Sequence, residues 1–396
     1  MTALEISAAT RLPELVPYRY GRMAASPFAF LRGSADVMAS DLASTPTSDL
    51  RVQTCGDAHV GNFGEFATPE RNIVFDVNDF DETIPGPWEW DLKRLATSVE
   101  VAQRTNEVPP ERRRRVVADA LGVYRKRMAG YASMRALDVW YSRIDIGDVI
   151  EFFPKCYRPL VERDVARARR RTHLRALSRL TEVTGGHRRF VSNPPLLVRL
   201  EETEHDMDEV LGLIEGYRAS LTEDLRELLD RFRLIDVARK VVGVGSVGTR
   251  YWIGLLEGPH HRSGDPLFLQ VKEASASVLA PFVGDSPLGH DGLRVVTGQR
   301  LTQATSDIFL GWSQGPRTGR QYYVRQLWDV KGAGDPMAMD VSNFAHYAKL
   351  SAWALARGHA RTGDPVAITG YLGTTDRFDQ AVAAIREGRV VAHAEP

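Results

Sequence analysis

The spacing of hydrophobic and polar positions changes several times along this chain of 396 residues. Two short β-rich runs, Val52 to Thr54 and Ile73 to Val77, come before a helical pattern from Trp90 to about Thr105. From Glu111 to Leu234 the apolar positions recur almost entirely at intervals of three and four residues, which is typical of amphipathic helices. The pattern predicts two early strands, a helix and then an all-helical region.

At Val241 the spacing becomes that of a sheet. Four β-rich runs follow, separated by glycine and proline turns: Val241 to Val244, Arg250 to Leu256, Leu267 to Lys272 and Tyr322 to Gln326. A helical stretch, Leu293 to Phe309, lies between the third and fourth runs, and a last strong helix is predicted over Val341 to His359. We therefore expect an α+β protein in four parts: residues 1–110, 111–235, 236–335 and 336–396.

Composition narrows the classes of partner. Lys plus Arg and Asp plus Glu are equal at 51 each, so no overall field attracts nucleic acid. The two cysteines, Cys55 and Cys156, provide neither a disulfide framework nor a four-ligand zinc pattern, which fits a reducing compartment. No apolar run has membrane-spanning length, and the amino terminus lacks the pattern of a secretion signal. We expect a cytoplasmic protein that binds neither nucleic acid nor membrane.

One short segment has a spacing that is typical of phosphate transfer. Asp57 stands five positions before Asn62, and Asp79 follows the β-like run that ends at Val77. A kinase catalytic loop and its metal-binding segment have this layout. Asp57 is the predicted base, which would orient an acceptor hydroxyl and take its proton. Asn62 and Asp79 would hold Mg²⁺, because hard divalent cations prefer amide and carboxylate oxygens.

Three neighbouring residues complete this part of the prediction. His59 is grouped with the catalytic residues and is expected to brace their loop. Asp81 is a candidate ligand of a second metal ion, but a solvated loop carboxylate is an equally good interpretation. Glu82 is expected to be a solvated loop carboxylate.

A glycine-rich segment far downstream predicts a nucleotide site. Backbone amides can approach phosphate oxygens only where side chains do not intervene, and Gly243 to Gly248 reads GxGxxG. In dinucleotide-binding turns the third glycine of this motif opens a helix. Here the aromatic and β-branched run Tyr251 to Leu256 follows, so the loop is expected to join two strands. The predicted nucleotide-binding residues are Gly243, Gly245, Ser246, Val247, Gly248 and Lys272.

The two halves of this site occur in the reverse of their usual order. In ordinary kinases the glycine loop precedes the catalytic loop, so we expect a circularly permuted, two-lobed protein-kinase-like fold. Residues 1–110 would carry the catalytic loop, 111–235 the helical substrate region, 236–335 the nucleotide-binding small lobe, and 336–396 helices that return to the large lobe. Gln326 and Leu327 would form the hinge that receives adenine through backbone groups.

One feature departs from the kinase pattern. A kinase lysine is paired with a glutamate on the following helix. Here the stretch from Leu293 to Thr305 contains no acidic residue. We expect one of three other side chains to orient Lys272: Gln299, Gln303 or Asp307.

The chain resembles the bacterial domain of unknown function 2252 family, which is similar to a permuted relative of the aminoglycoside phosphotransferases. The resemblance covers roughly Tyr20 to Gly373 and is carried by Arg22 to Gly33, Gly56 to Gly64, Asp76 to Glu82, Trp90 to Leu95, Gly243 to Arg250 and Ala354 to Ala360. It implies that Asp57 is the catalytic base, that Asn62 and Asp79 are metal ligands, and that Asp91 is a structural carboxylate supporting the loop. ATP and Mg²⁺ are the implied cofactors.

Several functions share these residues. The first expectation is an ATP- and magnesium-dependent phosphotransferase acting on a small-molecule hydroxyl or amine. Nucleotidyl transfer or ATP-driven ligation on the same fold is an alternative, and a non-catalytic nucleotide-binding pseudokinase is another. A dehydrogenase that uses the glycine loop would bind NAD and would need no Asp79. The sequence does not determine the acceptor or the oligomeric state.

Overall fold

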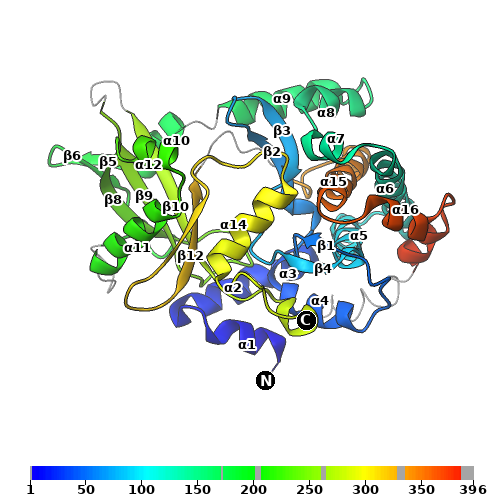
Figure 1. The fold of residues 1–396 in the computed structure, drawn as a ribbon, viewed down its shortest axis with the longest axis horizontal. Helices are drawn as coiled ribbons and strands as arrows, with labels where there is room; N and C mark the ends of the chain where they lie inside the picture. Colours follow the sequence, from blue (N-terminus) through cyan, green and yellow to red (C-terminus); the bar gives the residue numbers. More distant parts are fainter. Residues whose placement is uncertain (1, 171–172, 201–206, 260–264, 328–334, 385–396) are drawn as a thin grey trace.

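The computed structural model describes residues 2–170, 173–200, 207–259, 265–327 and 335–384. The sequence also predicts a polar connection from Trp328 to Pro336, and this segment lies largely outside the described residues. The protein has a mixed α+β architecture, in which a curved sheet lies on one side and a group of long helices on the other (Figure 1). Helix α14 (Asp291–Thr302) runs between the two, contacting strands of the sheet on one side and α15 (Val341–Thr362) on the other.

The sheet is antiparallel and has six strands in the order β11-β12-β10-β9-β8-β7. Their bounds are β7 (Leu197–Arg199), β8 (Arg233–Lys240), β9 (Tyr251–Glu257), β10 (Pro266–Ala274), β11 (Gly311–Gln314) and β12 (Gln321–Gln326). In β10, Lys272 lies opposite Tyr251 of β9 and Tyr323 of β12. Because successive side chains of a strand point to opposite faces, Val271 and Lys272 serve different sides of the sheet.

The helical side is built around one large hydrophobic core. Helices α5 (Trp88–Thr105), α6 (Pro110–Ala132), α15 and α16 (Pro365–Leu372) pack together here. Trp88 stacks on Tyr124 with a centroid distance of 5.8 Å, and both side chains are completely buried. Shorter helices surround this core: α7 (Ala136–Tyr141), α8 (Ile146–Phe152) and α9 (Arg158–Arg169).

Two small strand pairs frame the segment that contains Asp57. β1 (Arg51–Thr54) pairs with β4 (Ile84–Pro87), and β2 (Phe63–Ala67) pairs with β3 (Ile73–Val77). A 3₁₀ turn, η2 (Val60–Asn62), precedes β2. The chain from Cys55 to Thr83 is thereby folded back on itself between β1 and β4.

The amino-terminal segment lies below the sheet and α14 in Figure 1. It consists of α1 (Ala3–Ala9), η1 (Pro13–Leu15), α2 (Val16–Met23), α3 (Pro27–Gly33) and α4 (Ala35–Ala43). The remaining elements are α10 (His173–Leu180), β5 (Thr181–Thr184), β6 (His187–Phe190), α11 (Met207–Ala219), α12 (Glu223–Leu229) and α13 (Ala280–Val283). None of the described helices combines the length and the apolar character needed to cross a membrane.

Most of the predicted elements are present, but three of the predictions were wrong. The early strands, the helix after them and the last long helix are confirmed. The region 111–235 is not all-helical, because β5, β6, β7 and the start of β8 lie in it. The strand predicted at Val241 to Val244 belongs to a loop, since the strand is β8 and ends at Lys240. The helix expected to reach Phe309 ends at Thr302.

Candidate functional site

A polar cavity of about 140 Å³ opens between the sheet, the amino-terminal helices and the loops around Asp57 and Asp79. Carboxylates, guanidinium groups and the glycine-rich loop all line it. Its lining includes Ser7, Arg11, Arg19, Arg32, Asp36, Asp57, His59, Asn62, Asp79, Asp81, Glu82, Gly243, Val244, Gly245 and Ser246. The cavity therefore joins segments that are far apart in the sequence, such as Arg11 and Gly245, which are 234 positions apart.

Asn62 and Asp91 hold the loop that carries Asp57. The amide Nδ2 of Asn62 donates to the carbonyl of Asp57 at 2.8 Å. This hydrogen bond closes the loop between the two residues, which are five positions apart. The carboxylate of Asp91, from α5, accepts from the backbone N–H of Cys55 at 2.7 Å and of Gly56 at 2.9 Å. Gly56 has φ +80, and a Cβ there would lie 2.3 Å from the carbonyl of Glu82. The turn before Asp57 therefore requires glycine.

The side chain of Asp57 has an arginine partner that the sequence reasoning missed. Arg94 is 2% exposed and donates its Nε to Asp57 Oδ1 at 2.8 Å. Burial raises the pKa of Asp57, while the charge of Arg94 and its hydrogen bond act in the opposite direction. Arg94 follows Asp91 by three positions, so both side chains project from one side of α5 toward the loop.

His59 is buried next to Asp57. Its Nδ1 accepts from the backbone N–H of Gly61 at 3.2 Å, and its Nε2 lies 3.8 Å from Asp57 Oδ2. Burial, together with the charges of Arg32 and Arg94, holds the pKa of His59 well below its usual value. A neutral imidazole that bonds within its own loop matches the bracing role expected for it.

Asp79 and Lys272, from the two predicted halves of the site, lie close together. The Nζ of Lys272 lies 4.0 Å from Asp79 Oδ1 and 2.6 Å from Asp81 Oδ2. Asp81 also accepts from the hydroxyl of Tyr323 at 2.5 Å. Lys272 is 4% exposed; burial opposes its charge, yet the carboxylate of Asp81 raises its pKa well above the usual value.

The partner of Lys272 differs from the three side chains expected. Asp81 takes this place: one of its oxygens accepts from Lys272 and the other from Tyr323. Gln299 donates to Gln303, and Gln303 donates to the carbonyl of Val77. These two glutamines therefore support β3, not the lysine. Asp307 accepts instead from the backbone N–H groups of Phe309 and Gln326.

The pKa values of Asp79 and Asp81 are shifted in opposite directions. Burial and the charge of Asp81 raise the pKa of Asp79. Burial also acts to raise the pKa of Asp81, but the charge and hydrogen bond of Lys272, together with the hydrogen bond from Tyr323 and the charge of Arg325, lower that pKa. Asp81 is thus the closely paired anion, with Lys272 Nζ at 2.6 Å, whereas the same ammonium lies 4.0 Å from Asp79 and compensates its charge less well.

A cation would fit beside Asp79. The Oδ1 atoms of Asp79 and Asn78 are buried and have no hydrogen-bond partner among the described residues. Because Nδ2 of Asn62 is used by Asp57, Oδ1 is the atom of that amide suited to a metal ion. No three His, Cys, Asp or Glu side chains converge as a metal site within the described part of the chain. A Mg²⁺ ion here would need phosphate oxygens and water to complete its octahedron.

Arginines on the sheet side fix the backbone between Asn78 and Thr83. Arg294 of α14 donates to the carbonyls of Thr83 at 2.6 Å and Asp81 at 2.9 Å. Arg325 of β12 donates to the carbonyl of Asn78 at 3.1 Å. The segment that carries Asp79 is therefore attached to the sheet that carries Lys272.

The glycine-rich loop joins β8 to β9, as expected. Gly243, Gly245 and Ser246 line the cavity, and a Cβ on Gly245 would lie 3.0 Å from the carbonyl of Arg32. Val247 and Gly248 are also predicted to bind nucleotide, but they do not line the cavity. Val247 is completely buried in a separate apolar cluster with residues of the amino-terminal segment.

That segment was missed by the sequence reasoning, and it holds the loop from outside. Arg11 donates to the carbonyls of Gly245 at 2.7 Å and Val247 at 2.5 Å. Arg22 donates to the carbonyl of Gly243 at 2.6 Å. These partners are 234, 236 and 221 positions apart, so no local pattern could have revealed them.

The backbone groups of the predicted adenine hinge are already engaged. The N–H of Gln326 donates to the carboxylate of Asp307, and its carbonyl accepts from Gln270 Nε2 at 3.0 Å. The N–H of Leu327 donates to the carbonyl of Phe268 at 2.9 Å. Neither Gln326 nor Leu327 lines the polar cavity. Three of the four backbone groups expected to receive adenine are therefore engaged within the protein, and neither residue faces the polar cavity.

Glu82 is predicted to be solvated, but it lines the cavity. Its carboxylate accepts from the N–H of Val278 at 2.7 Å. Burial raises its pKa to about 7. The Asp81-Glu82 pair thus contains one carboxylate held charged by a lysine and one that titrates near neutrality.

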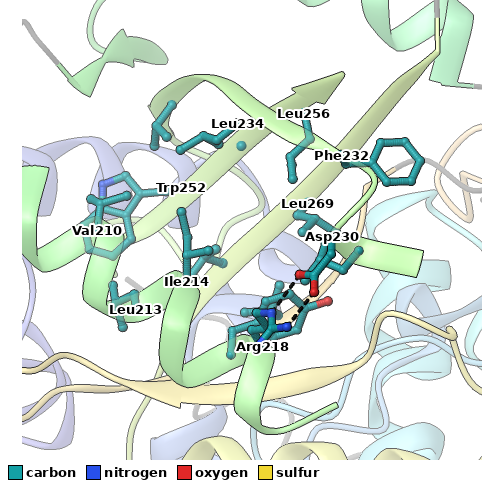
Figure 2. A pocket seen from close by; sticks show the side chains of 16 residues that line it. Val210, Leu213, Ile214, Arg218, Asp230, Phe232, Leu234, Trp252, Leu256 and Leu269 are labelled. Carbon is teal, nitrogen blue, oxygen red and sulfur yellow. Dashed lines mark hydrogen bonds and ion pairs between the residues drawn. The ribbon is translucent and has the colours of Figure 1, made fainter. Parts of the chain in front are cut away.

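A second cavity, of about 230 Å³, lies on the opposite face of the sheet under α11 and α12. Figure 2 shows Leu213, Ile214 and Trp252 among its apolar side chains, with an ion pair between Arg218 and Asp230 at one side. The lining includes Val271, the neighbour of Lys272 in β10. Among the described residues of its lining, Asp230 is the one carboxylate and it is paired with Arg218, so this cavity does not offer the metal ligands and proton acceptor that phosphate transfer requires.

The fold and the polar cavity together define an α+β protein with a charged cleft between an antiparallel sheet and a helical core. The chain belongs to the family described as an uncharacterized protein conserved in bacteria, DUF2252, whose family model matches residues 11–393. No curated protein and no solved structure matched the chain.

Proposed function

We propose that this protein is an ATP- and Mg²⁺-dependent phosphotransferase with a circularly permuted kinase-like fold, acting on a small-molecule hydroxyl or amine. The observation that carries the proposal is the contact of Lys272 with Asp79 and Asp81, two carboxylates that line the same cavity as the Asp57-Asn62 loop. These groups supply the three needs of phosphoryl transfer: charge neutralisation, a metal site and a positioned acceptor.

Each residue has a role that its contacts permit. Asp57 would accept the proton of the acceptor, while Arg94 fixes its orientation. Asn62 and Asp79 would hold Mg²⁺, which supplies positive charge to the phosphate oxygens when it is bound. Lys272 does not itself line the cavity, and it would reach the phosphates beside Asp79 and Asp81, with which it pairs. Gly243, Gly245 and Ser246 would provide backbone groups in the wall of the cavity.

Two alternatives use the same cleft. Nucleotidyl transfer would present the α phosphorus instead of the γ phosphorus to the acceptor, and the occupied hinge at Gln326 leaves the direction of the nucleotide open to that alternative. A pseudokinase is favoured by the Lys272-Asp81 pair, because a lysine held by that carboxylate is not placed as in an active kinase. NAD binding is disfavoured, because β9, not a helix, follows the glycine-rich loop.

The test is mass spectrometry of the nucleotides formed from Mg²⁺·ATP with a cell extract as the source of acceptor. ADP is expected from phosphoryl transfer, AMP would instead support nucleotidyl transfer or ligation, and intact ATP that is nevertheless bound would support a pseudokinase.

Asp57→Asn should lower turnover about 10²- to 10⁴-fold with little change in ATP affinity. Asp79→Asn and Lys272→Met should weaken binding, whereas Asp119→Asn, at an exposed pair with Lys349, serves as control.

A further inference from the structure

Arg19 presents unused hydrogen-bond donors to the polar cavity. The residue is 1% exposed, and its Nη2 donates to the carbonyl of Gly33 at 2.8 Å and the hydroxyl of Ser7 at 3.2 Å. Its Nε and Nη1 are buried and have no partner among the residues that the structure describes. Arg19 is one of the residues that line the cavity, so these unused donors lie on a side chain of its wall.

Arg32 adds a second donor to the same wall. It also lines the cavity, and its Nε is buried without a hydrogen-bond partner in the described ranges. Its charge acts on both Asp57 and His59, which places the guanidinium near the proposed catalytic loop. Its own carbonyl lies against Gly245 of the glycine-rich loop. Arg32 therefore lies near both halves of the site.

Burying a guanidinium without a partner is unfavourable in free energy, because the loss of hydration must be offset by an opposite charge or by hydrogen-bond acceptors. The charge of Asp36 supplies part of that compensation to Arg19, but Oδ2 of Asp36 is itself buried without a hydrogen-bond partner in the described parts of the chain. Arg11 differs from both arginines, since its guanidinium is bonded to the carbonyls of Gly245 and Val247. Among the described arginines that line the cavity, those with unused donors for a ligand are therefore Arg19 and Arg32.

We propose that Arg19 and Arg32 form an oxyanion subsite that binds a phosphate group, in the same cavity as the metal site proposed at Asp79. Guanidinium groups suit this ligand because their planar donors match phosphate oxygens. The subsite deepens the proposed function and rests on it for its neighbours, Asp57 and the glycine-rich loop. The phosphate has two sources: the terminal phosphate of the nucleotide, or a phosphate carried by the acceptor.

The subsite is tested by calorimetric titration of the full chain with inorganic phosphate. Arg19→Met and Arg32→Met should each weaken phosphate binding at least tenfold, and Arg19→Lys should weaken it less. Arg115→Met, at an exposed position of α6, is the matched control and should bind phosphate as the wild type does. Circular dichroism identifies variants that fail to fold; Arg32, which is only partly buried, keeps the test available if Arg19→Met unfolds. Wild-type phosphate affinity in folded Arg19→Met and Arg32→Met would overturn the subsite.

Titration with Mg²⁺·ATP and with AMP separates the two sources. Loss of ATP affinity without loss of AMP affinity in Arg32→Met assigns the subsite to the terminal phosphate. Loss of phosphate affinity alone assigns it to the acceptor.

Lys272→Met separates the subsite from the proposed function, because it should weaken ATP binding and leave inorganic phosphate binding in place. Arginine-dependent phosphate binding in a protein that binds no ATP would keep the subsite and reject the phosphotransferase.

Discussion

At the scale of single residues, the adjacent carboxylates Asp81 and Glu82 have different pKa values because they have different partners. Asp81 has Lys272 and Tyr323 within hydrogen-bond distance, whereas Glu82 has one backbone N–H. The charge of a nearby ammonium stabilises a carboxylate, and burial without such a charge destabilises it. Glu82 is therefore the carboxylate of this segment whose protonation should change near neutral pH.

Glu82→Gln tests this assignment. The pKa of Glu82 is raised from 4.5 to about 7, so the folded protein binds this proton more tightly than the unfolded chain does. Its contribution to stability is complete below the unfolded pKa and is lost as the pH rises through about 7. Between pH 5 and 8, approximate limits set by these two pKa values, the free energy of unfolding of the wild type should fall relative to that of the variant by roughly 1 to 3 kcal/mol.

Urea unfolding at several pH values measures this difference. Glu223→Gln is the control, because Glu223 is 76% exposed and should give a curve parallel to the wild type. Parallel curves for Glu82→Gln as well would show that burial does not perturb Glu82.

At the scale of elements, the amino-terminal segment acts on the glycine-rich loop from outside the cavity. The carbonyls of Gly243, Gly245 and Val247 accept from Arg22 and Arg11, and Val247 packs into the same apolar cluster as Leu12 and Leu15. Loop carbonyls that are held this way restrict the motion of residues 241–248, a segment in which three of eight residues are glycine.

Arg11→Gln should therefore loosen the loop. Amide hydrogen exchange at residues 243–249 is expected to become faster, by about tenfold for a loss of about 1.4 kcal/mol of local stability, while exchange in α5 stays unchanged. Mass spectrometry of peptic peptides measures both regions in one sample. Unchanged exchange over the loop, with nucleotide affinity also unchanged, would show that the Arg11 contacts do not restrain it.

The predictable elements were those whose pattern has one simple interpretation. Ile73 to Val77 is β-branched or aromatic at every position except Asp76, and it is β3 with the same bounds. β4, by contrast, contains two prolines, which favour a turn, although its pairing with β1 makes it a strand. In the hairpin β5-β6, β5 is mostly exposed and β6 has two arginines, so neither strand shows a clear alternation of apolar and polar positions. Pairing with another strand decides both cases: β4 pairs with β1 across about thirty positions, and β5 pairs locally with β6.

The residues of the candidate site also divide into those that a local sequence pattern reveals and those that it does not. Asp57, Asn62 and Asp79 could be found because their spacing is local and because the chemistry needs oxygen ligands there. Arg94 has a local signal as well, since it follows Asp91 by one helical turn. Asp81 as the partner of Lys272 could not be predicted, because the two residues are 191 positions apart and the kinase pattern places the partner on the helix after the lysine.

At the scale of the whole molecule, contacts between sequence-distant segments hold the cleft in place. Asp76 of β3 and Arg357 of α15 form a completely buried ion pair at 2.6 Å, although 281 positions separate them. Arg357 also donates to the carbonyl of Thr302 at the end of α14 at 2.8 Å. One guanidinium thus joins the strand before Asp79 to two helices.

Arg357→Met should destabilise the whole protein. Removing one member of a buried pair leaves the other charge without compensation, which costs about 3 to 5 kcal/mol. Urea unfolding at neutral pH measures the loss. Lys349→Met in the same helix is the control, because Lys349 is only half-buried, its partner Asp119 is exposed, and such a pair should contribute less than about 1 kcal/mol. Equal stability of the two variants would contradict the role given to Arg357.

The engaged strand end at Gln326 has a consequence for inhibitor chemistry. A flat heteroaromatic compound that mimics adenine needs one donor and one acceptor on that backbone, and here it would first have to break hydrogen bonds to Asp307, Gln270 or Phe268. Compounds of that kind should therefore be poor competitors for this protein. Polyanionic compounds directed at the arginine side of the cavity would meet no such obstacle.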